Sequence, residues 1–333
     1  MANRAESGNS PALTTHPGDA NLRPGSPIDD KCCSTLYRRQ TQRFLPTRGC
    51  GTQGAGLIFP KGGNMGTTGY IMEHQDEALR LDIKTGGEAI ARQAGWAGIR
   101  PGMRVADVGC GSGKTTAFLH SLIQPGGEAV GIDASESRIR HATEHYGTEG
   151  LSFVQRDFYH PLDGLGGFDF IWVRFVLEYH RAKSVEIVRN LSELLNPGGI
   201  LCLIDLDHNC LNHYGLSPRL EDAIQGVMAE LETRHDFDPH IGRKLYSFLY
   251  DMQFTDISVH MDHHHLIYGP LTDMDGYNWT KKLEVAARNS GYPFAEYEGG
   301  FEEFLEEFKV FFADPRRFTY TPLIACRGCK PLS

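Results

Sequence analysis

The sequence contains no long hydrophobic run. Its apolar stretches fall well short of the roughly 18 residues that a membrane-spanning helix needs, and none has the form of a secretory signal core. Positive charge is also scarce, because 33 Lys and Arg stand against 42 Asp and Glu, a formal net charge of −9. Phosphate backbones bind basic surfaces, so this balance argues against a nucleic-acid partner.

Cysteine is sparse, with eight scattered among 333 residues. The C-x-x-C spacing of Cys326 and Cys329 occurs in redox and zinc sites, but no second pair or neighbouring histidine has matching spacing. In the run Asp262–His265, only His263 and His265 would share one face of a strand, and two ligands do not make a dedicated metal site. We therefore expect reduced thiols, no metal and a cytoplasmic location.

Residues 1–64 do not have the composition of a folded domain. They are rich in Gly, Pro, Ser, Thr, Asn and Arg, and their best apolar run is Leu57–Phe59. Such a segment buries too little surface to offset its ordering entropy, so we predict a disordered extension. An alternative is that translation starts at Met65. A third interpretation, an organelle transit peptide, is disfavoured because the segment has no amphipathic helix. The segment carries +4, which leaves −13 on the predicted folded domain, residues 65–333.

Short apolar runs and helical patterns alternate along the middle of the chain. Strands are expected at 104–108, 128–132, 151–155, 168–173 and 200–204, with helices at 75–93, from 114, at 136–145 and at 182–195. This rhythm predicts a parallel sheet covered on both faces. After 205 we expect helices at 218–234 and 241–252, a strand at 255–268, a helical region at 275–312 and a last strand at 318–325.

A glycine-rich turn follows the first strand, and three kinds of cofactor site compete for it. A phosphate-binding loop ending in Gly113-Lys114-Thr115 would need its first glycine at position 108, which is valine. A dinucleotide fingerprint begun by Gly109 and Gly111 would need a third glycine where Lys114 stands. Both signals are therefore incomplete.

The third kind of site fits every position. An apolar strand, Asp107, and then Gly109, Gly111 and Gly113 resemble the first motif of the class I S-adenosylmethionine-dependent methyltransferases, in the branch that acts on quinones and natural products. Further motifs of that family are matched at 131–135, 153–158, 168–173 and 194–199. The resemblance implies a doubly wound, Rossmann-like, seven-stranded sheet, mostly parallel with an antiparallel last strand, and helical lid insertions near 205–245 and 270–312.

The resemblance also assigns roles to individual residues. Asp133 would bind the ribose diol, Asp157 the adenine amino group, and Phe158 the adenine ring; Arg174 would lie beside the methionine end. Tyr70 and Arg80 would close a lid helix over the cofactor carboxylate. The expected cofactor-binding residues are Tyr70, Arg80, Asp107, Gly109, Cys110, Gly111, Gly113, Asp133, Ala134, Asp157, Phe158 and Arg174.

The function implied is methyl transfer from S-adenosyl-L-methionine to a small molecule, releasing S-adenosyl-L-homocysteine. The Asn/Asp-Pro-Pro-Tyr motif of nucleobase amino methylases is not found after 168–173, which again disfavours nucleic acid. The acceptor atom stays open among oxygen, nitrogen and carbon. His180, His208 and His213 follow the fourth and fifth strands and are candidate bases. The alternative is a cofactor-binding regulatory or partner protein without transfer activity.

Overall fold

The computed structural model describes residues 87–332. The predictions for the extension 1–64, for the start at Met65, for most of the helix at 75–93, and for Tyr70 and Arg80 therefore lie outside the described residues. The described chain begins with α3 (Gly87–Ala97). It continues through β1 (Arg104–Val108), α4 (Lys114–Leu122), β2 (Glu128–Asp133), α5 (Glu136–Tyr146), β3 (Leu151–Gln155), β4 (Phe168–Arg174), η1 (Leu177–Tyr179), α6 (Ser184–Glu193) and β5 (Leu195–Leu206).

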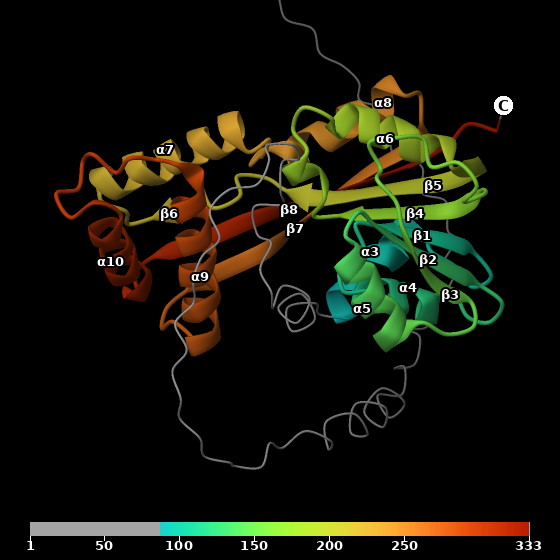
Figure 1. The fold of residues 1–333 in the computed structure, drawn as a ribbon, viewed down its shortest axis with the longest axis horizontal. Helices are drawn as coiled ribbons and strands as arrows, with labels where there is room; N and C mark the ends of the chain where they lie inside the picture. The colour runs from blue at the N-terminus through green and yellow to red at the C-terminus, as the bar shows by residue number, and fades with distance from the viewer. Residues whose placement is uncertain (1–86, 333) are drawn as a thin grey trace, which may run out of the picture. The chain divides into compact units, whose positions relative to one another are not determined.

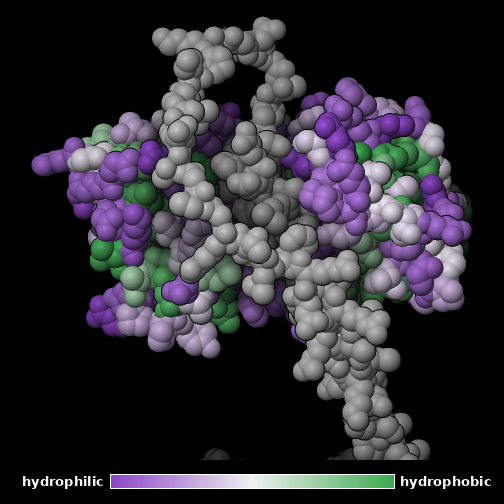
Figure 2. Space-filling view, turned by 60° about the horizontal axis from the view of Figure 1, so that its bottom comes forward, coloured by the Kyte–Doolittle hydropathy of each residue, from purple (hydrophilic) through white to green (hydrophobic). Residues whose placement is uncertain are grey.

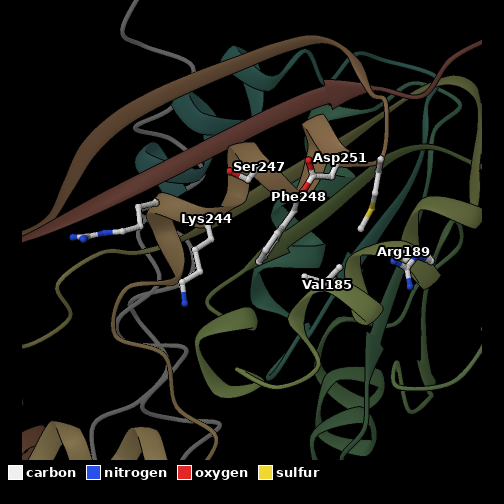
Figure 3. A pocket seen from close by; sticks show the side chains of 8 residues that line it. Val185, Arg189, Lys244, Ser247, Phe248 and Asp251 are labelled. Atoms are coloured by element: carbon white, nitrogen blue, oxygen red, sulfur yellow. The ribbon is translucent and has the colours of Figure 1, made fainter.

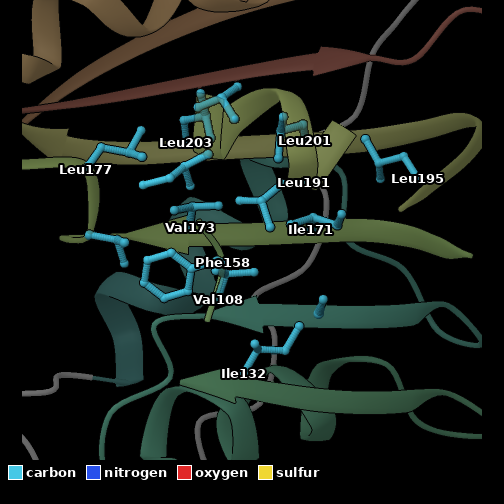
Figure 4. Packing of buried hydrophobic residues seen from close by; sticks show 14 of the residues in the cluster. Val108, Ile132, Phe158, Ile171, Val173, Leu177, Leu191, Leu195, Leu201 and Leu203 are labelled. Carbon is cyan, nitrogen blue, oxygen red and sulfur yellow. The ribbon is translucent and has the colours of Figure 1, made fainter. Parts of the chain in front are cut away.

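Strands β1 to β5 form a parallel sheet in the order β3-β2-β1-β4-β5. Helices α3, α4 and α5 cover one face, where Ile90, Leu119 and Trp172 share a buried cluster. The other face packs on α6, where Val173 and Leu191 are buried together, and Figure 4 shows this cluster between the strands and the helix. Because helices cover both faces of the sheet, the sequences of these strands are nearly continuous apolar runs.

The sheet ends in an antiparallel pair of long strands. β8 (Phe318–Cys329) lies antiparallel to β5, and β7 (Thr255–Tyr268) lies antiparallel to β8 at the edge. This confirms the predicted doubly wound sheet with an antiparallel last strand. A two-residue strand, β6 (His213–Tyr214), adds to β8 beyond the end of β5.

The structure departs from the sequence prediction in the extents of several elements, of which three matter here. β5 begins at Leu195 rather than residue 200, because the Asn-Pro-Gly-Gly run joins the strand through an irregularity in its pairing with β4. β8 continues to Cys329, so the C-x-x-C motif lies within a strand. The helical region at 275–312 is two helices, α9 (Asp273–Ser290) and α10 (Gly300–Ala313), since Gly291 adopts a left-handed conformation with φ 78° and ends α9.

Beyond the parallel strands, β7 and β8 run on to a group of helices that we call the cap (Figure 1). The cap consists of α7 (Pro218–Arg234), α9 and α10, which surround their own buried cluster. Trp279, Phe304 and Phe308 are core residues of the cap, whereas Tyr214 and Tyr246 are exposed. Along the chain between α7 and β7 lie η2 (Ile241–Lys244) and α8 (Leu245–Asp251), which pack on the same face of the sheet as α6.

Figure 2 shows hydrophilic residues spread over the cap side and the sheet side of one face, with apolar residues between them. Among the described residues, no helix is both long and apolar enough to cross a membrane.

Truncation of Phe308 tests the cap core. Its side chain has no exposed surface and stacks on Phe312 with ring centroids 5.3 Å apart. Phe308→Ala should lower the free energy of unfolding by about 3–5 kcal/mol in urea denaturation, because it leaves a cavity. Val310→Ala, on the same helix but 67% exposed, is the control and should change it by less than about 0.5 kcal/mol. Equal effects would show that the cap has no such core.

Candidate functional site

The carboxyl ends of four parallel strands bring the predicted site residues to one edge. Val108 at the end of β1 pairs with Ile132 of β2 and Val173 of β4, so Gly109, Asp133 and Arg174 stand at the same level. Asp157 follows the end of β3 by two residues. Open α/β sheets bind ligands at this edge, next to the strand where the order reverses. Here the reversal lies between β1 and β4.

The turn from β1 to α4 is held in a conformation that needs glycine. Gly109, Gly111 and Gly113 have φ values of 74°, 55° and 89°. A β-carbon on Gly109 would come within 2.3 Å of Cγ2 of Val176, and one on Gly113 within 2.6 Å of Cβ of Ala142. The turn is therefore packed against both the segment after β4 and helix α5, and neither Gly109 nor Gly113 has room for a side chain.

Asp133, at the end of β2, is fixed by the turn and by the helix that follows it. The carboxylate is only 4% exposed and accepts hydrogen bonds from the backbone N–H of Gly111 at 3.0 Å and of Ser135 at 2.9 Å. Arg138 of α5 donates to Oδ1 at 3.1 Å and forms an ion pair with it at 3.0 Å. The side chain is thus oriented before any ligand binds.

Asp107 in β1 and Arg174 at the end of β4 place two groups of opposite charge next to the glycine turn. Burial raises the pKa of the Asp107 carboxyl to about 7, although the Thr116 hydroxyl donates to it at 2.7 Å and Arg174 opposes the rise. Burial lowers the pKa of the Arg174 guanidinium to about 10, against the attraction of Asp107 and Asp205. Arg174 lies over the Phe175 ring, 4.0 Å from its centroid. Its buried Nε has no hydrogen-bond partner among the described residues.

The remaining predicted contacts lie around this centre. Asp157 is exposed, and one of its oxygens accepts from the backbone N–H of Tyr159 at 2.9 Å. Phe158 is 6% exposed and belongs to the buried cluster below the strand ends, edge-on to His180. Cys110 is buried, and burial raises the pKa of its thiol. Ala134 lies on the surface, and its carbonyl accepts from Gln155 at 3.0 Å.

The three candidate histidine bases lie in three separate environments. His180 hydrogen bonds to the hydroxyl of Tyr159, and burial lowers the pKa of its imidazole. His208 lies just after β5 and contacts His240 and Arg243, at the start of η2 and within it. His213 lies in the cap core, where burial lowers its pKa to about 4 and both ring nitrogens have partners, Thr319 and the Cys210 carbonyl. Within the described chain, the three side chains therefore have no contact partner in common.

Sequence reasoning missed a buried polar chain beyond β4 and β5. The backbone N–H of Glu178 donates to the Asp205 carboxylate at 3.2 Å. The Glu178 carboxylate accepts a hydrogen bond from the Asn209 side-chain amide at 2.6 Å. The Asn209 carbonyl in turn accepts from Lys282 of the cap at 2.8 Å. Burial and the neighbouring Glu178 raise the pKa of Asp205 well above its ordinary value. The sequence shows that Glu178 and Asp205 follow the fourth and fifth predicted strands. It does not show that Lys282 of α9 contacts Asn209, because the two residues are 73 positions apart.

A groove of about 290 Å³ lies elsewhere, between α6 and α8 (Figure 3). Its lining includes Val185, Arg189, Phe248 and Met252 and contains no residue from the strand ends, so we do not assign the acceptor to it. The C-x-x-C cysteines, Cys326 and Cys329, are free. Within residues 87–332 no group of three or more His, Cys, Asp and Glu residues is placed to hold a metal ion.

Comparisons with known proteins agree with this geometry. Residues 99–249 match a family described as "Methyltransferase domain". The chain is 32% identical over 113 residues to a ubiquinone biosynthesis O-methyltransferase of Caulobacter sp. (strain K31), covering 32% of this chain and 42% of that protein. It is 30% identical over 108 residues to a demethylmenaquinone methyltransferase of Staphylococcus aureus (strain JH9), covering 32% and 44%. The chain thus spans less than half of the length of these two relatives.

One solved structure is similar over a longer span. The crystal structure of a candidate methyltransferase from Bacillus halodurans C-125 superposes with a TM-score of 0.50 and 18% identity, covering 73% of this chain and 99% of that one. At this identity the likeness concerns the fold, and it includes much of the chain outside the part shared with the curated relatives.

Gly109→Ala tests the close packing of the turn. The substitution should lower the free energy of unfolding by about 1–2 kcal/mol for its positive φ and by about 1–3 kcal/mol more for the collision with Val176. Gly102→Ala is the matched control, because its φ is 81° and a β-carbon there meets nothing within 4 Å. Equal losses of stability in urea denaturation would contradict the packing.

Proposed function

We propose that this protein transfers a methyl group from S-adenosyl-L-methionine to a small-molecule acceptor, since residues 99–249 match a methyltransferase domain family. The observation that carries the proposal is the convergence of the glycine turn, Asp133 and Arg174 on one sheet edge. The family supplies the cofactor, and the chain's own residues supply a fitting set of contacts.

Asp133 fits the ribose of the cofactor. Its Oδ1 accepts hydrogen bonds from Ser135 and Arg138, whereas Oδ2 accepts one from the backbone N–H of Gly111. A carboxylate oxygen accepts about two hydrogen bonds, so Oδ2 retains capacity for a ribose hydroxyl. Asp157, exposed beyond β3, supports the proposed contact with the adenine amino group. Phe158 would reach the ring from the core rather than from the surface.

Arg174 and Asp107 fit the amino-acid end of the cofactor. The unpartnered Nε of Arg174 is a donor for a carboxylate, and Asp107 is an anion for an ammonium group. In the absence of such a partner, burial favours the neutral form of Asp107. Tyr70 and Arg80 remain proposed contacts to the same end, on the strength of the sequence alone.

The reaction asks little covalent chemistry of the protein. S-adenosylmethionine supplies a methyl group on a sulfonium, which is already activated for displacement. The chain would contribute by holding the cofactor at the sheet edge, orienting the acceptor under the cap and excluding water; orientation of this kind contributes up to about 7–11 kcal/mol in favourable cases. No residue is assigned as a base, because the three histidines lie in separate environments.

Two observations support a small-molecule acceptor. The two curated relatives are named for ubiquinone biosynthesis and for demethylmenaquinone, and the predicted domain carries a net charge of −13, unsuited to nucleic acid. The acceptor atom stays open, and a cytoplasmic location remains a prediction from the sequence.

Calorimetry with S-adenosylhomocysteine tests cofactor binding. The wild-type chain should bind the ligand with one site, and Arg174→Met should weaken binding by about tenfold or more, since it removes a charged contact. Arg140→Met, an exposed arginine on α5, is the control and should bind as the wild type does. The absence of binding by the folded chain would refute the proposal. Binding without methylated product across broad acceptor panels would favour the regulatory alternative.

The pH dependence of binding tests Asp107. A carboxylate attracts the ligand's ammonium group, whereas the protonated acid, which prevails below the pKa of about 7, does not. The dissociation constant should therefore rise by up to about tenfold for each pH unit below 7 and level off above it. Asp107→Asn should bind weakly with this step removed. A wild-type profile that stays flat from pH 5 to 8, or an unchanged step in the variant, would contradict the assignment.

A further inference from the structure

A small cavity lies between the cap and the ends of β4 and β5. It measures about 30 Å³ and borders η1, the loop after β5, α7 and α9. Most of its lining residues are apolar or aromatic, and Lys282 is the charged one; the lining residues are Tyr179, Asn209, Cys210, Met228, Leu231, Phe237, Lys282 and Ala286. Placing a cation at the wall of an apolar cavity costs free energy unless an anion pairs with it, so the Lys282 ammonium group favours an anionic ligand.

Lys282 has a neutral hydrogen-bond partner at this wall. Its Nζ donates to the Asn209 carbonyl at 2.8 Å and lies 5.6 Å from the centroid of the Trp279 ring. Within residues 87–332 no ion pair is formed between Lys282 and a carboxylate within 4 Å. The ammonium group has three N–H bonds, so two donors remain beyond the one given to Asn209.

The amide that holds Lys282 is itself rigid. Asn209 is 1% exposed; its Nδ2 donates to Glu178 at 2.6 Å, and its backbone N–H donates to the Pro239 carbonyl at 3.0 Å. Glu178 is 3% exposed and tied to Asp205. This chain of contacts fixes the Asn209 carbonyl toward the lysine, which positions the ammonium group at the cavity.

The cavity is within reach of the proposed cofactor site. Tyr179 follows Arg174 by only five residues, a span of at most about 17 Å even when fully extended. Between them, Val176 contacts the glycine turn, and η1 bends the chain back. The chain segment that connects the cavity to the proposed cofactor site is therefore short.

We propose that this cavity binds the carboxylate of the methyl acceptor, with Lys282 as its counter-ion. The inference rests on the proposed function and narrows it to acidic acceptors. A volume of about 30 Å³ holds roughly two water-sized groups, enough for the two oxygens of a carboxylate and too little for an aromatic ring. The apolar body of the acceptor would lie outside the cavity, on the side of the cofactor.

Matched acids and amides test the proposal without knowledge of the true acceptor. The probes are benzoate and hexanoate, each compared with its uncharged amide, benzamide and hexanamide. Their binding to the full chain is measured by ligand-observed NMR, with and without saturating S-adenosylhomocysteine. We expect the wild type to bind each acid about tenfold or more tightly than its amide, because a charged hydrogen bond is lost in the amide.

Four variants separate charge from structure. Lys282→Met removes charge and donors, and Lys282→Gln keeps a donor for Asn209 but removes the charge; both should lose the preference for the acid. Lys282→Arg should keep it in part. Lys281→Met is the control, because Lys281 is half exposed and pairs with Glu284 on the surface of the same helix; it should behave as the wild type does. Melting temperatures establish that each variant is folded.

Equal binding of acid and amide by the wild type would overturn the proposal. A preference that survives in Lys282→Gln would also overturn it, leaving Lys282 as a structural tie between α9 and the loop. Calorimetry with S-adenosylhomocysteine on the same samples keeps the two proposals apart. A preserved preference for acids without cofactor binding would refute methyl transfer and leave the carboxylate cavity standing.

Discussion

The close packing of the glycine turn against the segment after β4 is the constraint on which the site depends. Because Val176 occupies the space that a β-carbon of Gly109 would fill, the ends of β1 and β4 are locked together. The same turn donates its Gly111 N–H to Asp133 and so fixes β2 as well. One stretch of backbone thereby sets the relative positions of the three strand ends that carry the proposed cofactor contacts.

Charge burial gives this edge its chemical character. Asp107, Asp133 and Asp205 are all less than 5% exposed, and each meets the low-dielectric interior differently. Asp133 accepts hydrogen bonds from backbone donors and forms an ion pair with Arg138, whereas burial raises the pKa of Asp107 to about 7. Asp205 shares its environment with Glu178. An edge that holds both a firmly hydrogen-bonded carboxylate and a buried acid of raised pKa fits a ligand that carries both hydroxyl groups and a cation.

Much of this arrangement could be predicted from the sequence, for a physical reason. Parallel strands that are buried on both faces are local apolar runs, and residues at their carboxyl ends must meet at one edge. The strand registers accordingly bring Gly109, Asp133 and Arg174 to the same edge. The cap could not be predicted in the same way. His213 follows β5 but turns into the cap core, and Lys282 reaches Asn209 from a helix 73 residues later. Such contacts depend on tertiary packing that no local pattern encodes.

A crystal structure of the chain with S-adenosylhomocysteine tests the central claim most directly. The account predicts the ribose hydroxyls against Asp133, the amino-acid end between Asp107 and Arg174, and the sulfur facing the side of the cap. A ligand bound away from the ends of β1, β2 and β4, or bound there with Asp133 turned from the ribose, would contradict it.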